Sequence, residues 1–189
     1  MSPAADLDAD LDADLDGDRE LVAGLLREVP DFPQPGIRFW DLTTVLADAR
    51  GLAATTRLLS APVAERPVDV VVGIEARGFL LGAAVAQALG LGLVPVRKQG
   101  KLPAVAASRS YDLEYGSATL ELPAGVLASG ARALLVDDVL ATGGTAAAAC
   151  ELVEECGATV ASLAVVLELP GLDGRGRLAG RPVHAVLER

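Results

Sequence analysis

The chain has 189 residues, of which 51% are hydrophobic, and this length and composition suit one domain with a sizeable buried core. No apolar run reaches the roughly 18–20 residues needed to span a bilayer, and the N-terminus lacks the basic and then apolar pattern of a signal peptide. One histidine and two cysteines nearly exclude catalytic triads, His-rich metal sites and a disulfide framework. We therefore expect a cytoplasmic protein, not bound to membranes, whose chemistry rests on carboxylates, Lys, Arg and backbone amides.

The net charge of −10 is concentrated at the N-terminus, where residues 1–20 carry −7 of it. Asp occupies every second position there, a pattern that forms strands poorly and has little apolar content to pack. We expect residues 1–18 to form a disordered acidic tail and residues 19–189 to form a single domain. The remaining chain has no basic stripe, which argues against nucleic acid as a partner.

The tail also contains the first half of a calcium-loop pattern. Asp12, Asp14, Asp16 and Gly17 match the start of an EF-hand loop. That loop needs a bidentate Glu at its twelfth position, where this chain has Ala23. We therefore expect no calcium site.

Helix and strand patterns alternate from Arg19 onward. The first helical stripe runs to Val29, and prolines from Pro30 onward end it. We expect strands over 68–74, 91–96, 133–136, 160–167 and 183–187, helices over 51–60, from Gly78 to about Leu89 and over 145–156, and a hairpin or long loop over 111–122. Fully apolar strands that alternate with helices predict an α/β fold, with a parallel sheet covered on both faces. Such sheets bind ligands at the carboxyl ends of their strands.

Residues 133–150 carry the clearest chemical signal. A buried strand ends in two adjacent carboxylates, Asp137 and Asp138, and an alanine-rich helix follows after a small-residue loop made of Ala141, Thr142, Gly143, Gly144 and Thr145. Glycines let backbone N–H groups turn toward a phosphate, and the helix N-terminus adds its positive dipole end. Ionised carboxylates accept hydrogen bonds from vicinal hydroxyls and stabilise positive charge that develops on a ribose. The combination predicts a ribose 5-phosphate site.

A cluster of cations follows two neighbouring predicted strands. Arg77 comes after the first strand, and Arg97, Lys98 and Lys101 come after the second. Four positive groups around one cleft would hold a pyrophosphate leaving group. Taken alone, residues 97–101 fit a solvated basic loop equally well.

Five motifs in this sequence resemble those of a known family. Residues 133–145 resemble the motif with which type I phosphoribosyltransferases bind phosphoribosyl pyrophosphate (PRPP), and residues 31–41 resemble the N-terminal signature of the adenine phosphoribosyltransferases. Residues 73–79, 96–103 and 111–116 look like three further motifs of that family, in the same order. The resemblance implies a type I phosphoribosyltransferase fold, a parallel sheet with helices on both faces and a small N-terminal hood at about 19–45.

The resemblance also implies a reaction and its partners. The expected enzyme makes AMP and pyrophosphate from adenine and PRPP, and it forms a homodimer. Mg²⁺ would be held mainly by pyrophosphate and ribose oxygens, with no ligand directly from the protein. Alternatives are a phosphoribosyltransferase for hypoxanthine, xanthine or orotate, and a PRPP-sensing regulator without turnover. The regulator would need a DNA-binding domain that this chain has no room for.

Residue roles follow from the matched motifs. The catalytic set would be Asp137, Asp138, Glu114 and Arg77; the loop Ala141–Thr145 would hold the 5-phosphate; and Arg77, Arg97, Lys98 and Lys101 would hold pyrophosphate. The adenine ring would lie between Phe39 and Val139, with its edge read by backbone groups of Arg38 and Trp40. Tyr111, Glu114 and Tyr115 would belong to a flexible loop over the site, and Glu114 would handle a purine proton. The resemblance further implies a cis peptide at Glu75–Ala76. Ordinary core packing remains an alternative for Phe39 and Trp40.

Overall fold

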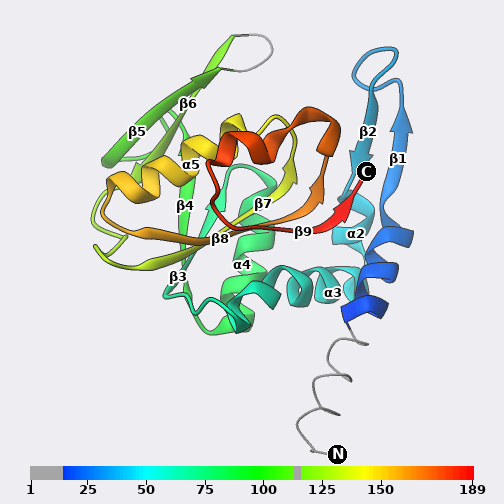
Figure 1. The fold of residues 1–189 in the computed structure, drawn as a ribbon, viewed down its shortest axis with the longest axis horizontal. Coiled ribbons are helices and arrows are strands. Elements are labelled where there is room, and N and C mark those ends of the chain that lie inside the picture. The colour runs from blue at the N-terminus through cyan, green and yellow to red at the C-terminus, as the bar shows by residue number, and fades with distance from the viewer. Residues whose placement is uncertain (1–14, 113–115) are drawn as a thin grey trace, which may run out of the picture. The chain divides into compact units, whose positions relative to one another are not determined.

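The computed structural model describes residues 15–112 and 116–189 (Figure 1). The chain divides into two compact units, Met1–Leu58 and Leu59–Arg189. Within the described residues, no helix has the length and apolar character needed to cross a membrane.

The N-terminal unit contains helices and a two-stranded hairpin. Its elements are a helix over residues 15–25, the antiparallel strands β1 (Arg27–Pro30) and β2 (Arg38–Asp41), α2 (Thr43–Ala47) and most of α3 (Ala49–Ser60). The first helix was predicted to continue to Val29, which was wrong. Val29 instead pairs with Phe39 in the hairpin, because the intervening proline-rich turn brings the chain back on itself.

The start of this unit also corrects the predicted tail. The chain is already helical at residue 15, so the disordered tail does not extend to residue 18. Asp18 is only 7% exposed and accepts hydrogen bonds of 2.7 and 2.6 Å from the Arg57 guanidinium. This paired carboxylate fixes the helix start against α3, a long-range contact that the local charge pattern does not reveal.

The C-terminal unit is built on one seven-stranded sheet. Its strands are β3 (Val70–Ile74), β4 (Gly92–Lys98), β5 (Val105–Asp112), β6 (Ser117–Pro123), β7 (Arg132–Leu140), β8 (Thr159–Glu168) and β9 (Val183–Glu188), in the spatial order β5-β6-β4-β3-β7-β8-β9. Strands β4, β3, β7, β8 and β9 are parallel, while β5 and β6 form an antiparallel hairpin at one edge. The predicted parallel α/β sheet is confirmed, and the hairpin begins earlier than predicted.

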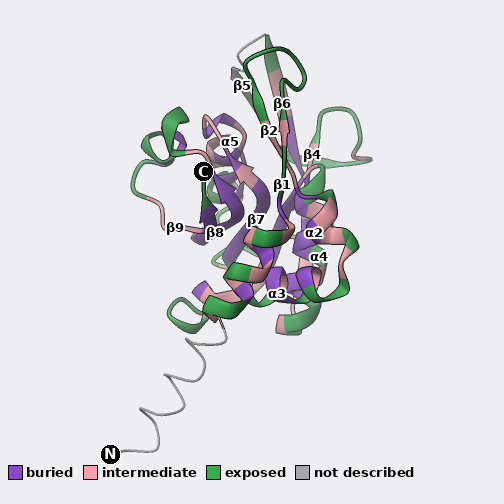
Figure 2. Ribbon diagram, turned by 90° about the vertical axis from the view of Figure 1, so that its right-hand side faces the viewer, coloured by how far each residue is buried: buried purple, intermediate pink, exposed green. Residues whose placement is uncertain are grey.

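Helices cover both faces of this sheet, as Figures 1 and 2 show. Helix α4 (Arg77–Leu89) connects β3 to β4, and α5 (Gly144–Glu155) connects β7 to β8. Because these two connections leave the centre of the sheet in opposite directions, right-handed crossovers place their helices on opposite faces. Short 3₁₀ helices complete the unit: η1 (Ala61–Ala64), η2 (Pro170–Leu172) and η3 (Gly174–Leu178). Buried aliphatic side chains of the central strands fill the core, and the ribbon of these strands is largely purple, the colour of buried residues, in Figure 2.

Glycines bring α4 very close to the centre of the sheet. A Cβ atom at Gly78 would lie 2.6 Å from the carbonyl oxygen of Val136, and one at Gly73 would lie 2.8 Å from that of Gly78. Since real Cβ atoms do not approach backbone so closely, only glycine fits at both positions. The tight packing sets the start of α4 beside the carboxyl end of β7, where the acidic pair lies.

Candidate active site

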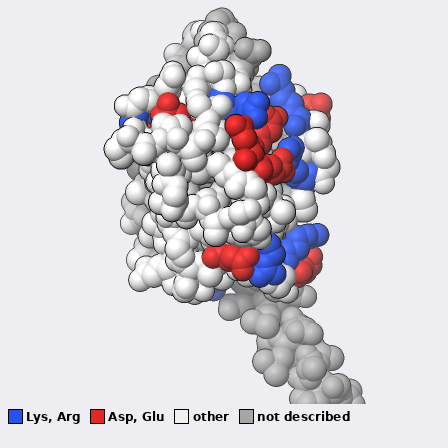
Figure 3. Space-filling model, turned by 90° about the vertical axis from the view of Figure 1, so that its left-hand side faces the viewer, with Lys and Arg blue, Asp and Glu red and all other residues white. Residues whose placement is uncertain are grey.

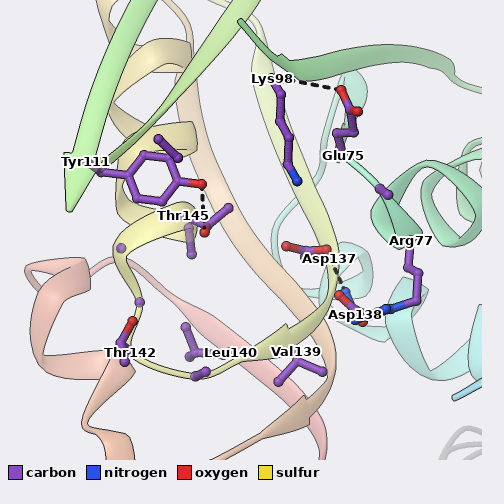
Figure 4. A pocket seen from close by; sticks show the side chains of 16 residues that line it. Glu75, Arg77, Lys98, Tyr111, Asp137, Asp138, Val139, Leu140, Thr142 and Thr145 are labelled. Carbon is purple, nitrogen blue, oxygen red and sulfur yellow. Dashed lines mark hydrogen bonds and ion pairs between the residues drawn. The ribbon is translucent and has the colours of Figure 1, made fainter. Parts of the chain in front are cut away.

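A cavity of about 420 Å³ opens at the carboxyl ends of β3, β4 and β7 (Figure 4). Eleven residues that sequence analysis proposed for the site line it: Arg77, Lys98, Tyr111, Asp137, Asp138, Val139, Ala141, Thr142, Gly143, Gly144 and Thr145. They come from five different elements of one unit. The structure therefore brings the predicted phosphate loop, acidic pair and part of the cation cluster into one place.

The phosphate loop connects β7 to the N-terminus of α5. Gly143 has a φ of +79°, a left-handed conformation that favours glycine, and α5 begins at the next residue. The Thr145 hydroxyl, in the first turn, donates a hydrogen bond of 3.2 Å to the Tyr111 phenol oxygen. The loop and the first turn of α5 line the cavity, so the positive end of the helix dipole lies beside it, which suits a phosphate.

The acidic pair lies beside this loop at the end of β7. Asp137 and Asp138 are 8% and 7% exposed, and the Asp138 N–H donates a 2.9 Å hydrogen bond to Asp137 Oδ1. Asp138 forms an ion pair with the Arg77 guanidinium. Burial, together with the neighbouring charge of Asp138, raises the pKa of Asp137 well above its usual range. The pair therefore combines a carboxyl group that holds its proton more tightly than usual with a carboxylate matched by a cation.

Glu75 organises the predicted pyrophosphate cations, and sequence analysis gave it no such role. Its Oε1 accepts a hydrogen bond of 2.8 Å from the Lys101 ammonium, and its Oε2 accepts the Lys98 N–H at 3.0 Å and lies 3.4 Å from Arg97 Nε. Of the described residues around the cavity, Lys98 and Glu75 line it, whereas Arg97 and Lys101 do not. Figure 4 shows the Lys98 ammonium pointing into the cavity toward the acidic pair. The sequence did contain a signal for this role, because Glu75 is an acidic residue placed between a buried strand and Arg77.

The ionisation of Glu75 reflects these cations. Its side chain is 10% exposed, and burial alone would raise its pKa. Hydrogen bonds from Lys101 and the Lys98 N–H outweigh burial, so the pKa of Glu75 lies below its usual range. The peptide bond between Glu75 and Ala76 is cis, as the sequence resemblance implied.

Other charged side chains form ion pairs on the surface of the C-terminal unit. Arg109 of β5 pairs with Glu151 at 3.3 Å and Glu155 at 2.8 Å on α5, and Arg132 pairs with Asp69 at 2.8 Å. On the face drawn in Figure 3, basic and acidic side chains lie together in mixed clusters. These pairs join elements within the unit.

The predicted adenine-binding residues belong to both units. Arg38, Phe39 and Trp40 form most of β2 in the N-terminal unit, and Val139 lies on β7 in the other. The Phe39 ring packs edge-on against Phe32, with 5.1 Å between the ring centroids. This contact uses one part of the ring and leaves Phe39 only half-buried.

The predicted flexible loop is only partly described. Tyr111 lies on β5 and lines the cavity, so it belongs to a regular strand. Glu114 and Tyr115 lie outside the described residues.

Comparison with known proteins gives concordant results. The family model for the phosphoribosyl transferase domain matches residues 41–178. A curated adenine phosphoribosyltransferase of Saccharopolyspora erythraea is 59% identical over 165 residues, covering 87% of this chain and 89% of the relative. The crystal structure of adenine phosphoribosyltransferase from Thermoanaerobacter pseudethanolicus matches with a TM-score of 0.86 and 44% identity, over 90% of this chain and 99% of that one. The Saccharomyces cerevisiae enzyme, crystallised with an imino-altritol bisphosphate and adenine, matches with a TM-score of 0.86 and 38% identity over the same shares.

Proposed function

The chain belongs to the phosphoribosyl transferase family, among its adenine phosphoribosyltransferases, and we propose that it transfers the phosphoribosyl group of PRPP to adenine, giving AMP and pyrophosphate. The observation that carries this proposal is the cavity at the carboxyl ends of β3, β4 and β7, where a phosphate loop adjoins two buried carboxylates. A phosphate site next to a diol-binding acid pair matches the ribose 5-phosphate part of PRPP.

The bond that breaks joins the ribose to pyrophosphate, and the cavity offers acidic side chains for the ribose and basic side chains for pyrophosphate. With the 5-phosphate in the loop Ala141–Thr145, the ribose hydroxyls would face Asp137 and Asp138, and the negative charge of Asp138 would stabilise the cationic ribose as the bond to pyrophosphate breaks. Pyrophosphate would leave toward Lys98, with Arg77 between the acidic pair and the departing group. Adenine N9 attacks the anomeric carbon from the opposite face, and Glu114 would take up the purine proton.

Magnesium would be held through the substrate. Within residues 15–112 and 116–189, no group of three or more His, Cys, Asp or Glu side chains is arranged to hold a metal. When bound, Mg²⁺ neutralises charge on pyrophosphate; the protein residues orient the ribose and exclude water.

Backbone groups of β2 would select adenine. In a strand, the carbonyl of one residue and the N–H two residues later face the same side, so Arg38 and Trp40 offer an acceptor and a donor together. Adenine presents the complementary pair, an exocyclic amine donor beside a ring nitrogen acceptor. A 6-oxo base would place its carbonyl against the Arg38 carbonyl and leave both groups unpaired.

Pyrophosphate release from PRPP and Mg²⁺ in the presence of each free base tests this function. We expect kcat/KM for adenine to be at least about a hundredfold higher than for hypoxanthine, guanine or xanthine. Comparable rates with hypoxanthine would contradict the choice of base alone. No release with any base would contradict the transferase activity itself.

We also propose that the enzyme is a cytoplasmic homodimer. Small parallel α/β domains often pair symmetrically, which supports this assembly. Light scattering at micromolar concentration is expected to give twice the chain mass, and a monomer mass would contradict it.

A further inference from the structure

A short segment after β8 packs directly behind the phosphate loop. We call residues 170–178, which contain η2 and η3, the support segment (orange to red in Figure 1). A Cβ atom at Gly143 would lie 2.4 Å from the carbonyl oxygen of Gly174. Conversely, a Cβ atom at Gly174 would lie 2.3 Å from the carbonyl oxygen of Ala141. The two backbones touch with no room for a methyl group on either side, so the loop cannot move back without displacing the support segment.

An ion pair between the half-exposed Arg175 and the buried Glu168 anchors the support segment beside Gly174. Arg175 Nε lies 2.7 Å from Glu168 Oε1 and Arg175 Nη2 lies 2.6 Å from Glu168 Oε2, and the Glu168 side chain is 5% exposed. Arg175 Nη1 also donates a hydrogen bond of 3.2 Å to the Val183 carbonyl of β9. Such bidentate pairs fix geometry as well as adding energy, and pairing with Glu168 raises the pKa of Arg175.

The anchor lies at the strand end that leads into the phosphate loop. Glu168 is the last residue of β8 and stands opposite Leu140, the last residue of β7. The N–H of Leu169 donates a 2.9 Å hydrogen bond to the Leu140 carbonyl. At the other end of the segment, Leu178 is 1% exposed and belongs to the core. The support segment is therefore held at both ends and in the middle.

We propose that Gly174 and Arg175 are positioning residues that set the conformation of the phosphate loop and thereby the affinity for the 5-phosphate of PRPP. The proposal rests on the function proposed above. Neither residue is among the described residues that line the cavity, so both act through the loop and not by touching substrate. The cations at the ends of β3 and β4 do not depend on this segment, so pyrophosphate binding should be unaffected.

Binding of ribose 5-phosphate and of pyrophosphate, each measured by calorimetry, tests this assignment alongside the KM values for PRPP and adenine. The variants are Gly174→Ala, Arg175→Gln and Arg175→Lys; the last keeps the charge but loses the planar fork. The matched control is Arg132→Gln, which breaks the bidentate pair with Asp69 at the opposite, amino ends of the central strands β7 and β3.

We expect Gly174→Ala and Arg175→Gln to raise the ribose 5-phosphate Kd and the PRPP KM about tenfold, as when one or two well-placed hydrogen bonds are lost. For Arg175→Lys, the ribose 5-phosphate Kd and the PRPP KM should lie between those of Arg175→Gln and those of the unsubstituted protein. Pyrophosphate affinity and adenine KM should change less than about twofold, as should every constant of Arg132→Gln. If Gly174→Ala does not fold, the two variants Arg175→Gln and Arg175→Lys still test the proposal.

Two results would overturn the proposal. Unchanged ribose 5-phosphate affinity in the Arg175 variants is one, and an equal loss for ribose 5-phosphate, pyrophosphate and adenine is the other, since it indicates general destabilisation. Ribose 5-phosphate binding needs no turnover. A parent protein that binds it without releasing pyrophosphate from PRPP would therefore contradict the transferase function while leaving this test readable.

Discussion

Two largely buried carboxyl groups line the cavity at neighbouring strand ends, and their surroundings shift their pKa values in opposite directions. Asp137 follows the buried stretch of β7, where burial and the adjacent Asp138 raise its pKa. Glu75 follows β3, where burial also acts to raise its pKa, but Lys101, the Lys98 N–H and Arg97 outweigh it and lower the pKa. Little of either side chain is exposed, but Asp137 lies far deeper among protein atoms than Glu75, so depth of burial and the charged neighbours together set the opposite shifts.

This difference separates the two halves of the proposed reaction. At the β7 end, Asp138 carries negative charge and pairs with Arg77, which suits a ribose that becomes cationic. At the ends of β3 and β4, the carboxylate of Glu75 already pairs with Lys101 and Arg97. An incoming pyrophosphate would therefore compete with Glu75 for these two cations. The following variants break or sharpen this comparison.

Replacing Asp138 should have the largest effect. Asp138→Asn keeps shape and hydrogen bonding but removes charge that matters most when the ribose is cationic, so we expect kcat to fall by roughly 10²-fold or more with a modest change in PRPP affinity. Steady-state kinetics with a separate PRPP-binding measurement checks this. Asp69→Asn, at the opposite, amino end of the central strands, is the control and should leave kcat within about twofold. Equal losses in kcat and affinity would show that Asp138 acts only in ground-state binding.

Replacing Asp137 should stabilise the protein as pH rises. The pKa of Asp137 is raised in the folded state, while an unfolded Asp ionises near pH ~3.9. Between these two values ionisation favours unfolding, so stability is lost as pH rises through the window. Asp137→Asn cannot ionise and still accepts the Asp138 N–H. We expect its melting temperature to exceed that of the parent by a few degrees, about 2–4 °C for each kcal/mol gained, with a gap that widens from pH 4 to pH 8.

At Glu75, after β3, we expect the opposite dependence of stability on pH. The lowered pKa of Glu75 contributes stability that is present above the unfolded pKa and is lost as pH falls through the folded one. Glu75→Gln should therefore melt below the parent at pH 8, with a gap that narrows in acid. If both variants shifted the melting temperature in the same direction, the proposed difference in charge state would be wrong.

Patterns among residues close together in the sequence were enough to predict the parallel sheet, the phosphate loop and the acidic pair. The run from β7 through Asp137, Asp138 and Gly143 to α5 is continuous in the chain, so the phosphate loop and acidic pair could be placed at a strand end. The alternation of apolar strands and helices likewise predicted the parallel sheet.

The features that sequence analysis missed depend on contacts between distant residues. Glu75 meets Lys101 26 residues away, and Asp18 meets Arg57 39 residues away, in pairs that no local spacing reveals. Val29 fits a helical stripe, yet pairing with β2 overrides that preference. Gly174 reads as an ordinary turn glycine until the fold places it against the phosphate loop.

The smallest expected change concerns the affinity for pyrophosphate. In Glu75→Gln the neutral amide holds Lys101 and Arg97 less strongly and no longer repels a polyanion. Those two cations are half-exposed and partly exposed, and each such ion pair contributes about 0.2–1 kcal/mol. Releasing them should tighten pyrophosphate binding about three- to fivefold, measured by calorimetry at low ionic strength, and the gain should shrink as salt screens the charges.

Glu121→Gln is the matched control for this change. Glu121 is 7% exposed and accepts the Gly100 N–H at 3.0 Å, so it supports the same turn as Glu75 through a backbone group. We expect its substitution to leave the pyrophosphate Kd within about twofold, because Lys101 and Arg97 stay paired with Glu75. Weaker pyrophosphate binding in Glu75→Gln, with Glu121→Gln unchanged, would show that Glu75 orients these cations for the ligand and does not compete with it. Equal tightening in both variants would trace the effect to a loosened turn, and the contrast between the two strand ends would then rest on Asp137 alone.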